Sequence, residues 1–255
     1  MQTAAITAAG IDATYETVDV AATDLDAVIE LLRKERVAGN VTIPHKEAVA
    51  ERCDQITALA RDVGAVNTFW FEPDGTLVGD NTDVGGFDLA ARVLLEDGVA
   101  SAHVVLVGAG GAAAAVCEAV RLWPGAQITI AARTRARAAT LAARYPTLCS
   151  AIDFDPALRD GEFREALSRA QLVVNATPLG LAGAVMPVEP AQIVANCAVL
   201  DLSYRRGRTP WISACRARGL RAEDGLPMLV EQGALAFERW FGVPADRVAM
   251  WEAVK

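Results

Sequence analysis

Cysteine and histidine are scarce in this chain of 255 residues, and the few that occur are poorly spaced for joint chemistry. The five cysteines are scattered from Cys53 to Cys215 without a CxxC spacing, and the two histidines are His45 and His103. An odd number of widely separated cysteines argues against a disulfide framework and against a zinc site. We therefore expect free thiols and no catalytic metal.

Excess positive charge, long apolar runs and a basic leader are also missing. The net charge is −8, whereas proteins that bind nucleic acid need an excess of positive charge. No apolar run approaches the roughly 20 residues that span a bilayer, and the first residues lack a signal-peptide pattern. We therefore expect a protein that binds small molecules, without nucleic-acid or membrane partners. The free thiols favour the cytoplasm, and we expect a monomer or homodimer.

The hydrophobic pattern of the first third predicts a mixed α/β structure. Residues 15–20 and 37–43 have the character of strands, and residues 25–36 have apolar side chains at helical spacing. Residues 65–71 and 76–79 flank a Pro-Asp-Gly turn, which is typical of a hairpin.

From residue 103 onward, strands and helices alternate, which predicts a Rossmann-type doubly wound parallel sheet with helices on both faces. Its strands are expected at 103–107, 127–131, 171–175 and 198–202, and its helices at 111–122 and 135–144. A helix at 86–95 precedes this part, and helices at 226–241 and 244–253 follow it. The predicted domains are 1–82 plus 226–255, and 83–225.

A glycine-rich turn follows the strand at 103–107 and opens the next helix. It has the G-x-G-x-x-A form of a dinucleotide fingerprint in its required strand–turn–helix context. The glycines let the backbone approach a pyrophosphate, whose charge is favoured at a helix N-terminus. The cofactor-binding residues predicted here are Gly108, Ala109, Gly110, Gly111 and Ala112.

The end of the next strand predicts which dinucleotide binds. An NAD-preferring site places an acidic residue there to accept a hydrogen bond from the ribose 2′-hydroxyl. This chain instead has Arg133, Thr134 and Arg135, and a guanidinium suits a 2′-phosphate, which indicates NADP. Solvated arginines are the alternative, although they oppose the helix dipole. Asn175, Ala176 and Thr177 end a later strand and are expected on the nicotinamide side, although turn chemistry alone is the alternative explanation.

The segment Asn40-Val-Thr-Ile-Pro-His-Lys46 combines polar groups with one lysine at a predicted strand end. Asn40 and Thr42 are two residues apart and point to the same side of an extended segment. Asp83 opens a later helix, and alone it would be only a cap. Together Lys46 and Asp83 form a candidate acid/base pair, which could take up a hydroxyl proton while a cofactor accepts hydride.

Six motifs, in this order, resemble those of the shikimate dehydrogenases, and the resemblance covers essentially the whole chain. They are Asn40–Lys46, Gly64-Ala-Val-Asn67-Thr68, Gly79-Asp-Asn-Thr-Asp83, Gly108-Ala-Gly-Gly-Ala112, Asn175-Ala-Thr-Pro178 and Gly225-Leu-Pro-Met-Leu-Val-Glu-Gln232. The resemblance implies an NADP-linked enzyme that interconverts 3-dehydroshikimate and shikimate, with a substrate-binding N-terminal α/β domain, an NADP-binding Rossmann domain and a cleft between them.

The resemblance also implies roles for individual residues. Lys46 and Asp83 would be catalytic, Gly225 would lie near the nicotinamide, and Arg133 with Thr134 would meet the 2′-phosphate. The residues implied to bind substrate are Asn67, Thr42, Tyr204 and Gln232, with Asn40 nearby.

The sequence departs from the family in three places. Family members begin with a strand and a Ser-x-Ser loop that binds the substrate carboxylate; neither is present here, and we expect the true start to lie upstream, because losing a strand would expose a sheet edge. Ala132 replaces an asparagine, and Arg205-Arg206 replaces Asn-Pro. These arginines either supply charge for the carboxylate or are surface residues, and we favour the latter.

Three alternatives to shikimate dehydrogenase remain open from the sequence. A paralogue could act on quinate or a related ring acid. A non-catalytic NADP-binding homologue could have an incomplete substrate site. A different dehydrogenase could share only the nucleotide domain, but it would not explain Asn67 or Gln232.

Overall fold

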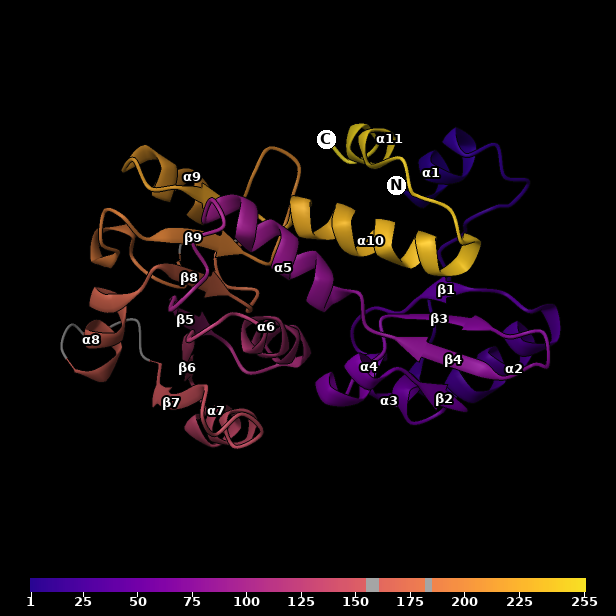
Figure 1. The fold of residues 1–255 in the computed structure, drawn as a ribbon, viewed down its shortest axis with the longest axis horizontal. Coiled ribbons are helices and arrows are strands. Elements are labelled where there is room, and N and C mark those ends of the chain that lie inside the picture. Colours follow the sequence, from indigo (N-terminus) through magenta and orange to yellow (C-terminus); the bar gives the residue numbers. More distant parts are fainter. Residues whose placement is uncertain (155–160, 182–184) are drawn as a thin grey trace. The chain divides into compact units, whose positions relative to one another are not determined.

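The computed structural model describes residues 1–154, 161–181 and 185–255 (Figure 1). The chain forms two compact units, each treated separately below. The first unit contains residues 1–86 and 230–254, and the second contains residues 87–229. The chain leaves the first unit within helix α5 (Asp83–Leu94) and returns within helix α10 (Leu226–Phe241).

The first unit is built on a four-stranded mixed sheet in the order β1-β3-β4-β2. The central pair, β3 (Thr68–Phe71) and β4 (Leu77–Asp80), is the antiparallel hairpin expected around the Pro-Asp-Gly turn. β1 (Gly39–Asn40) pairs antiparallel with β3, and β2 (Gln55–Ile56) pairs parallel with β4. The accompanying helices are α1 (Gln2–Ala8), η1 (Ala22–Asp24), α2 (Leu25–Glu35), α3 (Lys46–Ala50), α4 (Ala58–Val63) and α11 (Arg247–Glu252).

Two apolar clusters hold the first unit together. One lies under the sheet, where Leu25 and Ile29 of α2 pack with Phe69 and Leu77. The other joins α1, α10 and α11 through residues such as Ile6, Phe237 and Met250. Burying a side chain the size of phenylalanine stabilises the fold by about 2–3 kcal/mol. The two clusters thus form the apolar core of the unit that contains Lys46 and Asp83.

Two strand predictions in the first unit were wrong. Residues 15–20 form no strand, and of residues 37–43 only Gly39 and Asn40 pair in a sheet. The apolar side chains in 15–20 serve tertiary packing instead: Tyr15 stacks on Trp240 at 6.2 Å, and Val20 packs on the cluster under the sheet. Alternation of apolar and polar residues indicates which side chains are buried, but a strand also needs a neighbouring strand with which to form hydrogen bonds.

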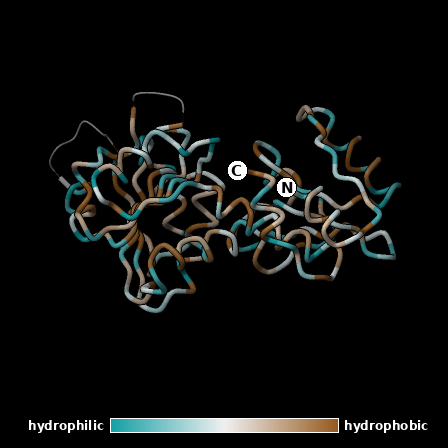
Figure 2. The backbone as a smooth tube through the Cα atoms, turned by 90° about the horizontal axis from the view of Figure 1, so that it is seen from above, coloured by the Kyte–Doolittle hydropathy of each residue, from teal (hydrophilic) through white to brown (hydrophobic). Residues whose placement is uncertain are grey.

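The second unit is a six-stranded, fully parallel sheet in the order β10-β9-β8-β5-β6-β7. This is the Rossmann strand order, with its switch point between β5 and β8. Its apolar stretches run through the middle of the unit (Figure 2). The strands are β5 (His103–Val107), β6 (Gln127–Ala132), β7 (Cys149–Asp153), β8 (Leu172–Asn175), β9 (Ala198–Asp201) and β10 (Ala222–Glu223).

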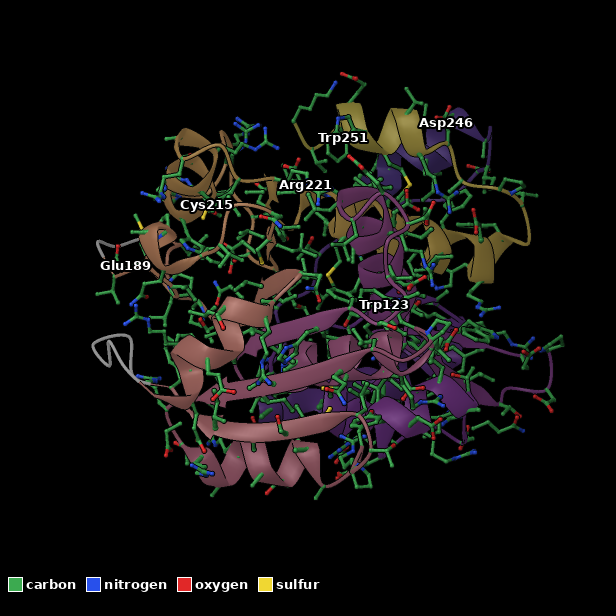
Figure 3. The ribbon with its side chains drawn as sticks, turned by 60° about the vertical axis from the view of Figure 1, so that its left-hand side comes forward. Trp123, Glu189, Cys215, Arg221, Asp246 and Trp251 are labelled. Carbon is green, nitrogen blue, oxygen red and sulfur yellow. The ribbon has the colours of Figure 1, made fainter. Side chains whose placement is uncertain are left out.

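The helices of the second unit follow its strands. They are α6 (Gly111–Arg121), α7 (Arg135–Ala142), α8 (Glu162–Arg169), η2 (Pro190–Gln192) and α9 (Pro210–Ala217). The part of α5 beyond the unit boundary is fixed by Trp123 (labelled in Figure 3), whose ring stacks on Phe87 at 6.1 Å and whose Nε1 donates to Asp88 at 2.5 Å. Both sheets confirm the predicted α/β class with a Rossmann-type unit. Among the described residues, no helix is long and apolar enough to span a bilayer.

Candidate active site

Lys46 and Asp83 form a direct ion pair in the first unit. Each is the first residue of a helix, α3 and α5 respectively, so both side chains are positioned by backbone that is already regular. Lys46 Nζ lies 2.6 Å from Asp83 Oδ2, and the two side chains are 22% and 10% exposed. Partial burial excludes much of the water that would weaken such a pair. A proton can therefore move between this pair and an oxygen placed beside it.

Asn67 holds the other oxygen of Asp83. Its Nδ2 donates to Asp83 Oδ1 at 2.8 Å and lies 3.3 Å from Gln232 Oε1. Its Oδ1 accepts from the backbone N–H of Thr82 at 2.7 Å. Asn67 is 2% exposed, so its amide links α10 to the loop before α5. The predicted residues Asn67, Gln232, Lys46 and Asp83 are thus brought together within one unit.

Asn40 is near this group but its side chain is already engaged. Its Oδ1 accepts from Tyr15 Oη at 3.1 Å and Gln2 Nε2 at 3.4 Å, and its Nδ2 donates to the Asn67 carbonyl at 3.4 Å. Burial raises the pKa of Tyr15, so this hydroxyl stays a donor at neutral pH. Thr42 is exposed, and its carbonyl accepts from the His45 N–H in the turn before Lys46.

In the second unit, the glycine turn lies at the carboxyl edge of the sheet. Gly108 has φ +115°, and a Cβ there would lie 2.9 Å from the Ala176 carbonyl, so only glycine fits. A Cβ at Gly110 or Gly111 would meet no atom within 4 Å. The first turn of α6 has no side-chain cap within the described part of the chain. These features fit a bound pyrophosphate.

The arginines at the end of β6 differ from one another. Arg135 forms ion pairs with Asp153 at 3.2 Å and Glu162 at 3.6 Å. Arg133 is exposed and has no ion pair within the described part of the chain. Arg137 is also exposed, in the first turn of α7, and it was not among the residues predicted from the sequence. Thr134 is the N-cap of α7 and makes no cap bond.

The side chain of Asn175 is directed into the second unit. It is fully buried, and its Nδ2 donates to Asp201 Oδ1 and the carbonyls of Thr177 and Leu179 at 2.9–3.1 Å. Its Oδ1 accepts from Thr177 N and Oγ1. Asn175 therefore shapes the loop, whereas Ala176 and Thr177 are partly exposed on it.

Asp201 is a buried residue that sequence reasoning did not single out. Its carboxylate accepts from Asn175 Nδ2 at 2.9 Å, Ser203 N at 3.1 Å and Thr209 Oγ1 at 2.9 Å. Burial outweighs these bonds and raises the pKa of Asp201 from 3.8 to about 6. An acidic residue ending a buried strand was the signal that could have identified it. Its role is to tie the ends of β8 and β9 together.

The remaining candidates, Tyr204 and Gly225, also lie in the second unit. Tyr204 is 48% exposed. Gly225 is buried, its N–H donates to the Ser203 carbonyl at 3.0 Å, and a Cβ there would collide with the Leu202 carbonyl. Arg205 and Arg206 are exposed. Across residues 1–154, 161–181 and 185–255, no group of three or more acidic, cysteine or histidine side chains is placed to hold a metal ion.

A Rossmann unit with an open glycine turn, joined to a unit that carries a lysine–aspartate pair, defines a two-domain α/β protein of the dinucleotide-binding class. Three family models match successive parts of the chain: the shikimate dehydrogenase substrate-binding domain at residues 1–69, shikimate/quinate 5-dehydrogenase at 88–181, and the shikimate 5′-dehydrogenase C-terminal domain at 225–255.

Individual relatives agree with these models. The shikimate dehydrogenase (NADP(+)) of Mesorhizobium japonicum is 43% identical over 92% of this chain and 82% of its own length. That of Symbiobacterium thermophilum is 43% identical over 95% and 83%. The chain therefore belongs to the shikimate dehydrogenase family, as its motifs indicated.

Solved structures that share the fold carry different enzyme names and different ligands. Shikimate 5-dehydrogenase of Thermus thermophilus, in complex with NADP(H) and shikimate, has a TM-score of 0.86 at 32% identity, over 99% of this chain and 91% of that one. The ligand-free 5-ketofructose reductase of a Gluconobacter strain has a TM-score of 0.86 at 32% identity, over 98% and 90%. Quinate dehydrogenase of Corynebacterium glutamicum, in complex with NAD, has a TM-score of 0.86 at 28% identity, over 98% and 90%.

Proposed function

We propose that this chain is an NADP-dependent oxidoreductase that interconverts shikimate and 3-dehydroshikimate. The observation that carries the proposal is the Lys46–Asp83 pair at 2.6 Å, held from the other side by Asn67. Relatives 43% identical over most of the chain are named shikimate dehydrogenase (NADP(+)), which supports this substrate and cofactor.

In the proposed reaction, Lys46 and Asp83 take up the hydroxyl proton during oxidation and return it during reduction. Bound NADP supplies or accepts the hydride. Asn67 and Gln232 orient the ring hydroxyls beside Lys46, and Thr42 and Tyr204 complete the substrate contacts. Asn40 acts behind them, since its amide is engaged by Tyr15, Gln2 and the Asn67 carbonyl.

The second unit has the features that would hold NADP. The backbone N–H groups at Gly108, Ala109, Gly110, Gly111 and Ala112, at the start of α6, would donate to the pyrophosphate. Arg133 and Thr134 meet the 2′-phosphate, with Arg137 close by in sequence, and Arg135 contributes less because Asp153 and Glu162 already neutralise it. Ala176, Thr177 and Gly225 line the nicotinamide side, with Asn175 shaping that loop.

These assignments give each part of the chain a role. We propose residues 1–82 with 226–255 as the substrate-binding and catalytic domain, and residues 83–225 as the NADP-binding domain. The five free cysteines support a reducing, cytoplasmic location. The protein would act as a monomer or homodimer.

The test is a spectrophotometric assay of NADPH formation with shikimate, comparing wild type with Lys46→Ala. Removing a positioned acid/base group costs roughly 10²- to 10⁴-fold in rate, and we expect a loss in kcat of this size. NADPH binding, followed by fluorescence titration, should be unchanged, because Lys46 lies outside the dinucleotide unit. An inactive wild type that still binds NADPH would instead support the non-catalytic alternative.

Quinate is the second candidate substrate, favoured by the similarity to a quinate dehydrogenase. The same assay with quinate, and with 5-ketofructose and NADPH in the reverse direction, decides between them. We expect kcat/KM to be highest for shikimate. A higher value for either of the others would replace shikimate in the proposal while leaving the acid/base pair in place.

A further inference from the structure

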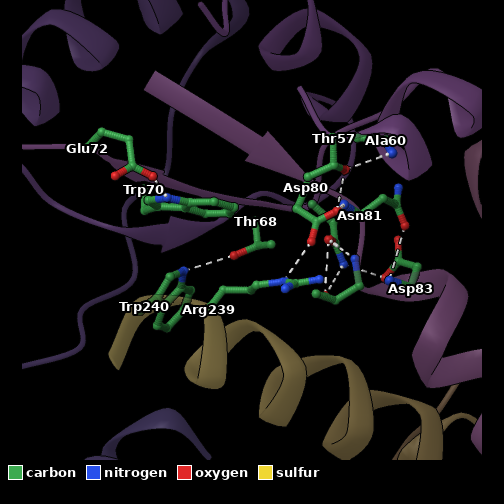
Figure 4. A network of polar contacts seen from close by, with 12 residues as sticks. Thr57, Ala60, Thr68, Trp70, Glu72, Asp80, Asn81, Asp83, Arg239 and Trp240 are labelled. Carbon is green, nitrogen blue, oxygen red and sulfur yellow. Dashed lines mark hydrogen bonds and ion pairs between the residues drawn. The ribbon is translucent and has the colours of Figure 1, made fainter. Parts of the chain in front are cut away.

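The loop that ends in Asp83 is held by an unbroken series of side-chain acceptors (Figure 4). The N–H of Asn81 donates to Asp80 Oδ1 at 2.8 Å, that of Thr82 to Asn67 Oδ1 at 2.7 Å, and that of Asp83 to Asn81 Oδ1 at 3.1 Å. Three successive backbone donors are thus satisfied by side chains rather than by a sheet or helix. The position of Asp83 depends on those acceptors staying in place.

Asp80 is the first acceptor in this series and is itself fixed by three donors. Besides the Asn81 N–H, its Oδ1 accepts from Thr57 Oγ1 at 2.5 Å, and its Oδ2 accepts from Arg239 Nε at 3.0 Å. Thr57 also caps α4, where its oxygen accepts from the Ala60 N–H. The Asp80 side chain is 3% exposed, and a cation beside it offsets part of the cost of burying a carboxylate.

Arg239 supplies that cation from α10. It lies seven residues after Gln232, which places both on the same face of the helix. The adjacent Trp240 donates from Nε1 to Thr68 Oγ1 at 3.0 Å, and Thr68 lies opposite Asp80 in the β3–β4 register. Gln232, near the start of this face, contacts Asn67. Arg239, near its end, contacts Asp80 (Figure 4).

From these contacts we infer that Arg239 and Asp80 are positioning residues for catalysis: their ion pair fastens α10 to the loop at residues 80–83 and so holds Asp83 beside Lys46. The inference rests on the proposed function. Without Arg239, Asp80 Oδ2 loses the contact that fixes it, so the carboxylate can turn and no longer holds the Asn81 N–H in one position. Asp83 then leaves its 2.6 Å contact with Lys46 more often, which lowers the rate of proton transfer.

The test compares Arg239→Met, a variant in α10, with a matched control variant at another arginine that forms ion pairs with α10. Arg247 of α11 pairs with Glu231 and Glu238 of α10 at 2.8 and 2.7 Å, and neither of these partners belongs to the loop at residues 80–83. Since small misplacements of a reacting group cost up to roughly 10²-fold, we expect Arg239→Met to lower kcat by about 10- to 100-fold with little change in KM. Arg247→Met should keep the kcat of wild type, and Arg239→Lys should recover most of the lost rate.

A second readout does not depend on activity. The chain has only three lysines, Lys34, Lys46 and Lys255, so reductive ¹³C-methylation, which keeps the charge, gives few signals. We expect the Lys46 signal, assigned with Lys46→Arg, to move in Arg239→Met and to stay in place in Arg247→Met. If wild type turns over no ring acid, the proposed function fails but this spectrum still tests the positioning role.

The inference is overturned if Arg239→Met and Arg247→Met have the same kcat and the same Lys46 spectrum. Equal losses of thermal stability in the two variants, without a difference in kcat, would show that the Arg239 pair is structural only. A double variant, Asp80→Asn with Arg239→Met, adds a check: if the two residues act as one device, its kcat should match that of the worse single variant.

Discussion

Each unit has a buried aspartate close in sequence to its candidate site residues, and the two aspartates differ in the partners that bind their carboxylates. Asp80 of the first unit faces the guanidinium of Arg239 at 3.0 Å. Asp201 of the second unit is fully buried and, among the described residues, accepts hydrogen bonds from the neutral donors of Asn175, Ser203 and Thr209. Hydrogen bonds alone do not compensate for its lost hydration, so its pKa rises to about 6. The buried carboxylate of the first unit is therefore paired with a cation, whereas that of the second unit is held by neutral donors and has a raised pKa.

The two candidate sites also differ in whether their polar groups already have partners within the protein. The first unit presents charged side chains whose bonding is nearly complete within the unit. The second presents backbone N–H groups and open space at Gly110 and Gly111, where a charged ligand would complete the bonding. Loss of side-chain atoms should damage the first site most, whereas added atoms should damage the second.

The largest effect expected from this comparison is a pH-dependent stability term from Asp201. Its folded pKa of about 6 lies above the ordinary 3.8, so the stability it contributes is fully present below about pH 4 and is lost as pH rises through 6. At 1.36 kcal/mol per pKa unit, this loss is about 3 kcal/mol. Asp201→Asn cannot ionise, so urea unfolding at pH 4.5 and 7.5 should show a smaller loss for the variant than for wild type.

Asp80→Asn provides the contrast for that experiment. This substitution removes a carboxylate that is paired with Arg239, so the variant should be less stable than wild type at pH 7.5. If Asp201→Asn and Asp80→Asn shifted stability in the same direction at pH 7.5, the difference drawn between the two carboxylates would be wrong.

The sequence predicted the second unit better than the first. Strand 103–107 of the second unit was predicted to the residue, because a buried, uninterrupted apolar run leaves a strong local pattern. Helix 226–241, most of which belongs to the first unit, was also predicted to the residue, because its apolar residues keep a helical period over 16 residues. β7 and α8 were missed, since the alternating polar residues of an edge strand weaken the signal. In the first unit, strands of two residues such as β1 are set by tertiary contacts and leave almost no local pattern.

The motifs identified the candidate residues, but they did not predict the hydrogen bonds that those residues form. Sequence order brought Lys46 and Asp83 together as a hypothesis, and the structure places them in contact. Nothing in the sequence distinguished Asn40 and Asn175, whose side chains are engaged internally, from groups free to bind a ligand. Arg239 and Asp201 were missed because their importance comes from partners distant in the chain.

The second prediction concerns the glycine turn, where we expect Gly108 to be needed for folding and Gly110 to be needed for binding the dinucleotide. Gly108→Ala should destabilise the second unit by about 1–3 kcal/mol, because φ is +115° and the Ala176 carbonyl is 2.9 Å from the added Cβ. Gly110→Ala meets no atom and should leave stability unchanged, yet weaken NADPH binding roughly tenfold, or about 1.4 kcal/mol. Thermal unfolding and fluorescence titration measure the two effects. Equal NADPH affinity in Gly110→Ala and wild type would contradict a dinucleotide lying over this turn.

The smallest expected effect tests whether an arginine already paired within the protein can still serve a ligand. Arg133 is exposed, with no ion pair among the described residues, whereas Arg135 is held by Asp153 and Glu162. Loss of one charge-assisted contact to a 2′-phosphate weakens binding by roughly tenfold, so Arg133→Ala should raise the Kd for NADPH by about that factor and leave the Kd for NADH unchanged. Arg135→Ala should alter the NADPH Kd by less than about threefold, because the two acids already neutralise its charge. Titrations of both cofactors against both variants decide this, and a larger effect from Arg135 would show that the phosphate displaces its acidic partners.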